Sequence, residues 1–320
     1  MDIAKYAAGP ESYVILSRVQ VSNFFSSNTS GTRDQCNALA AKLLGGPVSA
    51  TPIQGGSSYT VEREEAPKVV QFRSSQLDMA KLELAQQVYL DFVPQCVYYG
   101  TLGSIHVYVW NRVPGQAFCR VRRRMFTSDM GVDQRLRQTV EDFARFFALA
   151  WINKPTLEEL PLGLQDEYVA ILDKLSPTVP ERLHPIIDMV RQNLYLLFRP
   201  DFPIALQHGD LLENNFHVDE ATGHITGVVD WPDAFIAPFG LSLSGAEILF
   251  GIQTNSDWHF HPSHADLRQQ FWSTFHNEIG QVSELDMRSI EVARLMGLLR
   301  EYGFEQNGKS GVYLEKLLLR

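Results

Sequence analysis

One stretch of the chain concentrates carboxylate, amide and imidazole side chains at short spacing. Residues 207–218 read QHGDLLENNFHV, and a shorter polar segment at residues 228–231 reads VVDW. They flank two strand-like runs joined by a polar turn, which is the pattern of a β-hairpin. Because a short hairpin brings its two ends together, we expect Asp210, Asn215 and Asp230 to lie close to one another.

These three side chains suit a site for a hard divalent cation. Mg²⁺ takes a few protein oxygens together with the phosphate oxygens of a substrate. Asn215 and Asp230 supply such oxygens, so we predict that they hold the metal. Asp210 is then left for proton transfer, because it can orient an acceptor hydroxyl and take up its proton. This division of roles is the one found in phosphoryl transfer.

The spacing of these residues also resembles a known family. The pattern HxDxxxxN, followed by a short hairpin and Asp-Trp, is similar to the signature of the aminoglycoside phosphotransferase and choline kinase-like family of small-molecule kinases. The run over 208–234 looks like fungal-type members, and the resemblance extends more weakly over 54–115. It implies ATP as the phosphate donor, Mg²⁺ as cofactor, and a bilobal α+β fold of the protein-kinase type. It also implies that His208 supports the loop by hydrogen bonds and is not a base.

The resemblance further implies a nucleotide clamp in the N-terminal part of the chain. The family has a loop over the phosphates, a basic residue on the third strand with a glutamate partner in the next helix, and a linker whose backbone binds the base. Arg73 stands where the family has lysine; arginine keeps the charge but is larger and can bind phosphate through two N–H groups. The residues that fit these places are Gly55, Gly56, Ser57 and Ser58 for the loop, Arg73 and Glu83 for the ion pair, and Asn111 and Val113 for the linker.

The surrounding pattern predicts the elements that must position these residues. Before residue 111, helical and strand-like segments alternate as expected for a small antiparallel sheet with a helix against it. Beyond the linker, apolar residues recur mostly at helical spacing. We therefore predict an α+β chain with an N-lobe over 1–110, a helical C-lobe over 111–320, and a loop over 22–34. The predicted helices are 36–44, 77–89, 132–150, 165–174, 184–198, 243–251, 263–279, 284–302 and 310–319, and the predicted strands are 59–61, 69–73, 97–99, 105–110 and a hairpin over 214–230.

The composition argues against several classes of protein. The 320 residues carry 28 Lys and Arg against 37 Asp and Glu, a net charge of −9, which disfavours a nucleic-acid partner. No stretch reaches the roughly 18 apolar residues of a membrane helix, so we expect no membrane association. Cys36, Cys96 and Cys119 show no metal-type spacing, and the N-terminal segment is not a secretory signal. We expect a cytoplasmic protein whose negative charge suits a cationic ligand.

The acceptor is the least specified part of the prediction. Its pocket should come from the C-lobe, over 240–302, and acidic residues there could favour a small molecule that carries both an amine and a hydroxyl group. The same acids could equally be solvated helix faces. They are Glu247, Asp257, Asp266 and Glu278.

Two alternative functions stay open from the sequence alone. Arg73 in place of lysine leaves a pseudokinase, which would bind nucleotide or act as a scaffold without transferring phosphate. His217 and His224, which lie on or near the hairpin, leave a metal-dependent hydrolase that uses histidine and aspartate ligands. The intact set of Asp210, Asn215 and Asp230 argues against the pseudokinase, and the hydrolase would need a closer set of ligands.

Two further clusters have a functional and a simpler interpretation. His259, His261 and His264 could bind zinc, but no fourth ligand is near in the sequence. We therefore predict a surface loop or a wall of the substrate pocket. A basic run is expected to be a solvated face and consists of Arg120, Arg122, Arg123 and Arg124.

Overall fold

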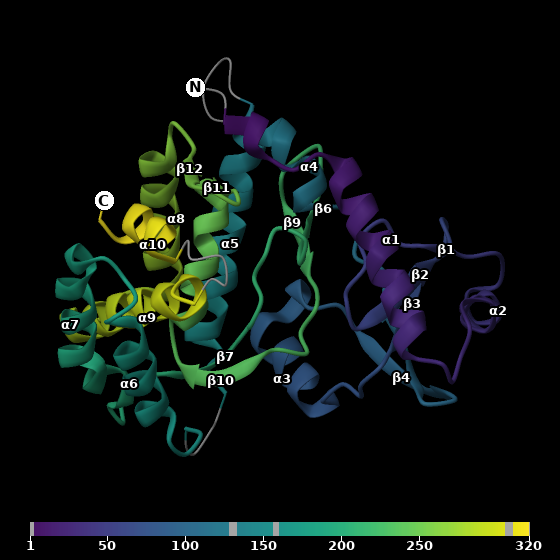
Figure 1. Cartoon of the computed structure of the whole chain (residues 1–320), viewed down its shortest axis with the longest axis horizontal. Coiled ribbons are helices and arrows are strands. Elements are labelled where there is room, and N and C mark those ends of the chain that lie inside the picture. Colours follow the sequence, from purple (N-terminus) through teal and green to yellow (C-terminus); the bar gives the residue numbers. More distant parts are fainter. Residues whose placement is uncertain (1–2, 128–132, 156–159, 305–309, 320) are drawn as a thin grey trace.

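The computed structural model describes residues 3–127, 133–155, 160–304 and 310–319, and these residues form two lobes (Figure 1). The smaller lobe is built on an antiparallel sheet, and the larger lobe is mostly helical. Each lobe has its own hydrophobic core. The bilobal α+β architecture that the sequence predicts is therefore confirmed.

The small lobe packs two helices against one face of a five-stranded sheet, and a third helix buries its apolar side chains in the core of the large lobe. Its strands are β1 (Ser49–Ala50), β2 (Ser58–Glu62), β3 (Lys68–Arg73), β4 (Cys96–Leu102) and β5 (Ile105–Asn111), and its helices are α1 (Pro10–Ser27), α2 (Arg33–Leu44) and α3 (Met79–Tyr89). The strand order is β1-β2-β3-β5-β4. Alternate strand residues such as Val61, Val70 and Phe72 are fully buried and form one core with Phe24 of α1 and Ala40 of α2. This alternation leaves the other face of β3 free to line a site.

The large lobe is a cluster of helices around a core rich in phenylalanine. Its α-helices are α4 (Phe118–Phe126), α5 (Gln134–Ile152), α6 (Leu164–Leu175), α7 (His184–Asn193), α8 (His264–Ile279), α9 (Glu284–Tyr302) and α10 (Ser310–Leu318), and the 3-10 helices of the chain are η1 (Ile3–Tyr6), η2 (Leu90–Phe92), η3 (Glu181–Leu183), η4 (Leu194–Phe198) and η5 (Leu241–Leu249). Phe143 and Phe147 of α5 lie in this core with Phe271 of α8. Within the part of the chain that the structure describes, no helix is long and apolar enough to cross a bilayer.

Short antiparallel strands in the large lobe fix the two ends of the predicted hairpin. They are β6 (Gln116–Ala117), β7 (Ile204–Gln207), β8 (Phe216–Val218), β9 (Ile225–Val228), β10 (Phe235–Pro238), β11 (Gly251–Gln253) and β12 (Trp258–Phe260). Strand β8 pairs with both β6 and β9, and β7 pairs with β10. The chain leaves β7 at Gln207 and enters β8 at Phe216, so residues 208–215 form a loop held at both ends. We call these residues the polar loop.

The predicted helices and strands are present, but one predicted segment is partly wrong and several elements were not predicted. The elements not predicted are helices α1 and α4 and strands β1, β6, β7, β10, β11 and β12. Of the loop predicted over 22–34, residues 22–27 belong to α1 and residues 33–34 to α2, so only residues 28–32 form a loop. The sequence pattern did not predict helix α1, because the helix buries only a narrow stripe of residues while apolar residues elsewhere on it are exposed. The buried residues are Ser17, Val21 and Phe24. Helix α4 was not predicted because its run of arginines obscures the spacing of its apolar residues. The segment predicted as a helix at 243–251 is 3-10 helix up to residue 249.

The N-terminal residues contact both lobes. Ile3 and Ala4 of η1 are buried in the core of the large lobe, and η1 packs against α4, β11 and β12. Tyr6 stacks on His259 of β12, with ring centroids 3.5 Å apart. Helix α1 then runs from α4 along the small lobe beside β2 (Figure 1). Residues 3–27 therefore bridge the two lobes at one side.

Gly115, in the linker (residues 111–115) that joins the lobes, is required by its geometry. Its φ is +78°, and a Cβ there would lie 2.2 Å from the carbonyl oxygen of Val218 in β8. Gly163 has nearly the same φ, +79°, but a Cβ there would meet nothing within 4 Å. Strain of the left-handed backbone alone costs about 1–2 kcal/mol.

We predict that Gly115→Ala lowers the free energy of unfolding by about 3 kcal/mol or more, whereas Gly163→Ala lowers it by about 1 kcal/mol. Urea unfolding of the two variants measures this difference. An equal decrease in the free energy of unfolding of both variants would show that the linker and β8 can move apart to accommodate a methyl group.

Candidate active site

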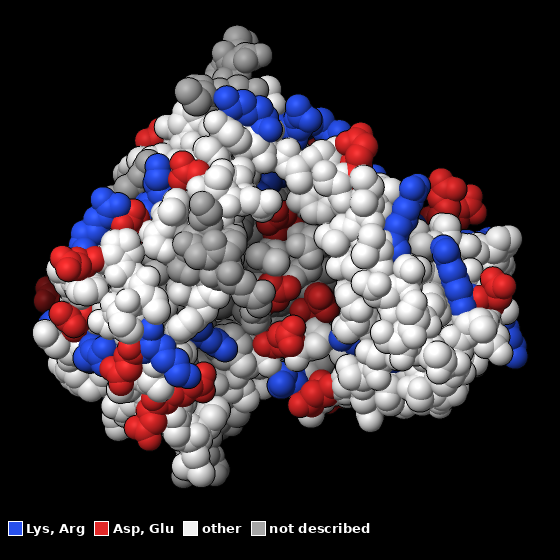
Figure 2. All heavy atoms as spheres, viewed as in Figure 1, with Lys and Arg blue, Asp and Glu red and all other residues white. Residues whose placement is uncertain are grey.

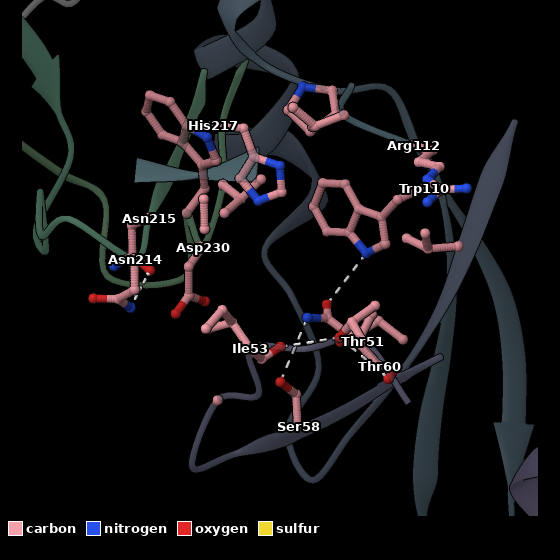
Figure 3. A pocket seen from close by; sticks show the side chains of 18 of the residues that line it. Thr51, Ile53, Ser58, Thr60, Trp110, Arg112, Asn214, Asn215, His217 and Asp230 are labelled. Carbon is pink, nitrogen blue, oxygen red and sulfur yellow. Dashed lines mark hydrogen bonds between the residues drawn. The ribbon is translucent and has the colours of Figure 1, made fainter. Parts of the chain in front are cut away.

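The three residues that the hairpin was predicted to bring together do converge. The Asn215 amide nitrogen donates to the backbone oxygen of Asp210 at 2.7 Å and to its carboxylate at 2.9 Å. Its amide oxygen accepts from the side chain of Asn214 at 2.7 Å. Asn214, Asn215 and Asp230 line a cavity between the lobes and lie near one another at its edge (Figure 3). An amide oxygen and a carboxylate thus face the same space.

Asp230 is held in an unusual backbone conformation. Its φ is +66°, in the left-handed region that residues other than glycine seldom adopt. The residues on either side explain how this is maintained. The Val229 N–H donates to the Asn215 carbonyl at 2.8 Å, and the Trp231 indole donates to the Val228 carbonyl at 2.9 Å. Strain of this kind is typical of sites where a side chain must be aimed.

His208 braces the polar loop, as the resemblance implies. The residue is 2% exposed, and its Nδ1 accepts from the Asp210 N–H at 3.1 Å while its Nε2 lies 2.9 Å from the carbonyl oxygen of Val229. Since a carbonyl only accepts, Nε2 carries the proton and the ring is neutral. Burial lowers the pKa of His208 to about 4. The ring therefore links the two ends of the hairpin and has no free nitrogen for catalysis.

Protonation of His208 opposes folding in acid. The folded-state pKa of about 4 lies below the ordinary 6.5, so its contribution to stability is present above pH 6.5 and is lost as the pH falls towards 4. The full difference corresponds to about 3 kcal/mol.

We predict that the free energy of unfolding of His208→Gln falls less steeply than that of the parent chain between pH 6.5 and 4, by roughly this amount over the interval. Urea unfolding across this range measures both slopes. Parallel slopes would contradict the assignment of a neutral, buried His208.

Asp210 and Asp230 both have raised pKa values. For Asp210, burial raises the pKa most, and the carboxylates of Asp230, Asp233 and Glu213 raise it further, against the hydrogen bond from Asn215. For Asp230, burial outweighs the attraction of Arg73, although 42% of its side chain is exposed to the cavity. A raised pKa makes Asp210 a better proton acceptor than an ordinary aspartate. The clustering of negative charge also favours a cation between these groups.

The glycine loop (residues 51–57) and Arg73 face the same cavity. Arg73 is 4% exposed; its Nη1 lies 3.8 Å from Asp230 Oδ1, and its Nη2 donates to Ser57 Oγ at 3.3 Å. Its Nε is buried without a hydrogen-bond partner among the described residues. Gly55 and Ser58 line the cavity, and a Cβ at Gly56 would meet nothing within 4 Å. This leaves an open loop beside a guanidinium whose donors are only partly used, which fits a phosphate.

The predicted ion pair between Arg73 and Glu83 is not formed. Glu83 is exposed, and the carboxylates that act on Arg73 are those of Asp230 and Asp233. The reason is the phase of α3. That helix buries Leu82, Ala85, Val88 and Tyr89, so the residue next to Leu82 turns to solvent, and the residues of this region that reach the cavity are Leu77, Asp78, Lys81 and Leu82.

The linker contributes to the lining of the cavity. Asn111 and Val113 line it, together with Trp110 of β5 and His217 of β8 (Figure 3). The Trp110 indole donates to the side-chain oxygen of Gln71 at 3.2 Å. Neither Trp110 nor Gln71 was singled out from the sequence. Side chains alternate between the two faces of a strand, and Gln71 is two residues from Arg73. The sequence could therefore have placed Gln71 on the same face of β3 as Arg73.

The acids predicted for the acceptor pocket are mostly paired elsewhere. Glu247 is 4% exposed and forms ion pairs with Arg268 and with Arg294, the latter at 3.8 Å. Asp257 pairs with Lys316, Glu278 pairs with Arg145, and Asp266 is exposed.

Two acids that were not predicted stand closer to Asp210. They are Glu213 of the polar loop and Glu301 of α9. The charge of Glu213 raises the pKa of Asp210, and the charge of Asp210 raises the pKa of Glu301. Burial raises the pKa of Glu301, against side-chain hydrogen bonds from Ser244 and Tyr302. Figure 2 shows acidic side chains gathered in the hollow between the lobes. The floor of this hollow is therefore negative.

The histidine clusters give no metal site. His217 lines the cavity, but His224 pairs with Asp142 at 2.9 Å, away from Asp230. His261 is fully buried beside Phe126. In the described ranges, no group of three or more His, Cys, Asp or Glu side chains could hold a metal ion. Within those ranges, the histidines supply no ligand set for the hydrolase alternative or for zinc.

The basic run of α4 is not a single solvated face. Arg122 is 4% exposed and pairs with Glu213 at 3.3 Å, and it also donates to the carbonyl oxygens of Ile248 and Gly251. Arg120 lines the cavity. The remaining two residues, Arg123 and Arg124, are exposed as predicted.

Comparison with solved structures identifies similar folds. A thermostable mutant of the aminoglycoside phosphotransferase APH(4)-Ia, in a ternary complex with ADP and hygromycin B, is 15% identical with a TM-score of 0.52, covering 86% of this chain and 93% of its own. Macrolide 2'-phosphotransferase type I is 15% identical with a TM-score of 0.50, covering 87% and 95%. A choline/ethanolamine kinase family protein from Mesorhizobium loti is 12% identical with a TM-score of 0.50, covering 87% and 90%. These likenesses show a shared kinase-like fold.

Comparison of sequences adds the family. No curated protein matches the chain in sequence. A family model described as the phosphotransferase enzyme family matches residues 50–243, which is more than half of the chain and includes the glycine loop, the linker and the polar loop. This chain belongs to the phosphotransferase enzyme family.

Proposed function

We propose that the protein transfers the γ-phosphate of ATP to a hydroxyl group of a small molecule. The observation that carries this proposal is the convergence of Asp210, Asn215 and Asp230 at one edge of a cavity whose opposite lobe supplies Arg73 and the glycine loop. Family membership supports phosphate transfer in general. The pseudokinase alternative depended on Arg73 in place of lysine. We do not propose it, because the guanidinium of Arg73 faces the same cavity as Asn215 and Asp230.

The residues present fit a magnesium-bound nucleotide. Asn215 and Asp230 would hold Mg²⁺, which when bound neutralises charge on the phosphates. Arg73 would bind a phosphate oxygen through its guanidinium, whose Nε has no hydrogen-bond partner among the described residues. Backbone groups of the glycine loop would cover the phosphates, and those of Asn111 and Val113 would bind the edge of the base. Their role is to fix the donor in position before reaction.

Asp210 would act on the acceptor. Its carboxylate would orient the attacking hydroxyl and take up its proton as the phosphoryl group is transferred. The raised pKa of Asp210 suits this role. His208 and Asn215 would keep the carboxylate in place through their hydrogen bonds to the backbone and side chain of Asp210.

The charge around Asp210 favours an acceptor that carries an amine as well as a hydroxyl. Glu301 provides negative potential in the hollow beside Asp210, whereas the charge of Glu213 is offset by its ion pair with Arg122. A protonated amine would be attracted to this hollow.

The test is ADP release from Mg-ATP across a panel of small alcohols, each matched with an analogue in which an amine replaces a hydrogen. We expect acceptor-dependent ADP release, and a lower KM for the amine-bearing member of each pair. A protein that shows neither acceptor-dependent turnover nor a rise in melting temperature with Mg-ATP would contradict phosphate transfer from ATP. Turnover without preference for amines would contradict the choice of acceptor alone.

A further inference from the structure

The polar loop is fixed from two sides, and one of them lies outside the part of the chain that matches the family. From the large lobe, the Cys119 N–H donates to the Glu213 carbonyl at 2.7 Å, and buried Arg122 pairs with the Glu213 carboxylate at 3.3 Å. From α1, the Tyr13 hydroxyl donates to the same carboxylate at 3.3 Å. Tyr13 precedes residue 50, where the family match begins.

One face of α1 also contacts the glycine loop. Ser17 is 8% exposed; its hydroxyl donates to the carbonyl oxygen of Pro52 at 3.0 Å and accepts from the Gln54 N–H at 3.1 Å. Gln54 in turn joins the loop to β2, because its side chain accepts from the Thr60 N–H at 2.9 Å and donates to the Thr60 carbonyl at 2.8 Å. Tyr13 and Ser17 are four residues apart, so they lie on the same side of the helix.

The two ends of this segment are anchored in different lobes. Residues 3–6 pack in the core of the large lobe, and Val21 and Phe24 of α1 pack in the core of the small lobe. The pKa of Tyr13 is raised, mainly by burial and next by the negative charge of Glu213. Tyr13 therefore stays a neutral hydrogen-bond donor at any pH where the protein would work.

We propose that Tyr13 is a positioning residue, which acts through Glu213 to hold the polar loop at a fixed place relative to the glycine loop. This inference rests on the proposed function for its catalytic consequence, since the two loops would carry the acceptor base and the phosphate donor. Helix α1 is the rigid link, with Ser17 at the glycine loop and Tyr13 at the polar loop. A small displacement between donor and acceptor lowers the rate of transfer more than the affinity for either substrate.

The first experiment is backbone amide hydrogen exchange without ligand, comparing the parent chain with Tyr13→Phe, Ser17→Ala and the control Tyr99→Phe. Tyr13→Phe keeps the ring, so the fold should persist. We expect both α1 variants to raise exchange in residues 211–216 by about threefold or more at unchanged melting temperature, and Tyr99→Phe, on an exposed position of β4, to change nothing. Ser17 forms its hydrogen bonds with residues 52 and 54 and none with the polar loop. Faster exchange in the polar loop of Ser17→Ala would therefore show that α1 links the two loops. Unchanged exchange at 211–216 in both variants would overturn the proposal.

The second experiment separates positioning from general damage. With an acceptor from the panel above, Tyr13→Phe should lower kcat about tenfold while KM for ATP changes less than about twofold. Equal losses in kcat and ATP affinity would show a general structural role and contradict the proposal. A parent chain that does not turn over ATP would contradict the proposed function, whereas the exchange result would still decide whether α1 holds the polar loop.

Discussion

Asp210→Asn should abolish acceptor-dependent ADP release, with kcat reduced by about 10²–10⁴-fold. The substitution removes the group that takes up the acceptor proton but retains its shape. Asn215 can still donate to the side-chain oxygen at position 210, as it does in the parent chain at 2.9 Å. The loss would therefore be one of chemistry, not of folding. The rate of ADP release at saturating acceptor measures it.

Binding of nucleotide should survive this substitution. Asp210 is not one of the residues assigned to the metal, and the neighbouring carboxylates raise its pKa, so loss of its charge relieves repulsion. The rise in melting temperature with Mg-ATP should be at least as large in Asp210→Asn as in the parent chain. Asp219→Asn is the matched control, because Asp219 lies in the turn of the same hairpin and accepts hydrogen bonds from the backbone of Ala221 and Thr222. Full activity of Asp210→Asn would exclude Asp210 as the base.

The sequence predicted the part of the site whose residues are close together along the chain. Asp210, Asn215 and Asp230 lie within one loop and one hairpin, so local geometry alone brings them together. Arg73 was predicted from the resemblance to the family, and alternation along β3 turns its side chain to the cavity. Such features depend on short-range periodicity, which a single sequence records directly.

The sequence did not predict the contacts that depend on packing between distant segments. Tyr13 and Glu213 are 200 residues apart, and nothing near either of them indicates the other. Glu301 reaches the hollow because α9 is packed against η5 beside it. The predicted ion pair of Arg73 with Glu83 is absent for a related reason. The orientation of α3 about its axis is set by the side chains that fill the core, and these turn Glu83 to solvent. Helical periodicity gives a buried face but not the residue opposite a given strand.

Asp230→Asn should remove magnesium-dependent binding of nucleotide and lower turnover by about 10³-fold or more. Asp230 is the one carboxylate assigned to the metal, and an amide at that position gives a much weaker ligand for Mg²⁺. The measurement is the Mg²⁺ concentration that gives half of the maximal rise in melting temperature with ADP. A variant with the Mg²⁺ requirement of the parent chain would contradict the assignment of Asp230 to the metal.

The backbone of Asp230 makes asparagine the informative substitution. At φ +66°, asparagine is among the few residues that tolerate the left-handed region, whereas alanine there costs about 1–2 kcal/mol. Asp230→Asn also removes the carboxylate nearest to Arg73, but Asp233 still acts on that guanidinium and the substitution removes a carboxylate whose own pKa is raised by burial. We therefore expect Asp230→Asn to melt close to the parent chain and Asp230→Ala to melt lower, with both losing the magnesium response. Two variants that differ in stability but share the same loss of function would locate that loss in the carboxylate.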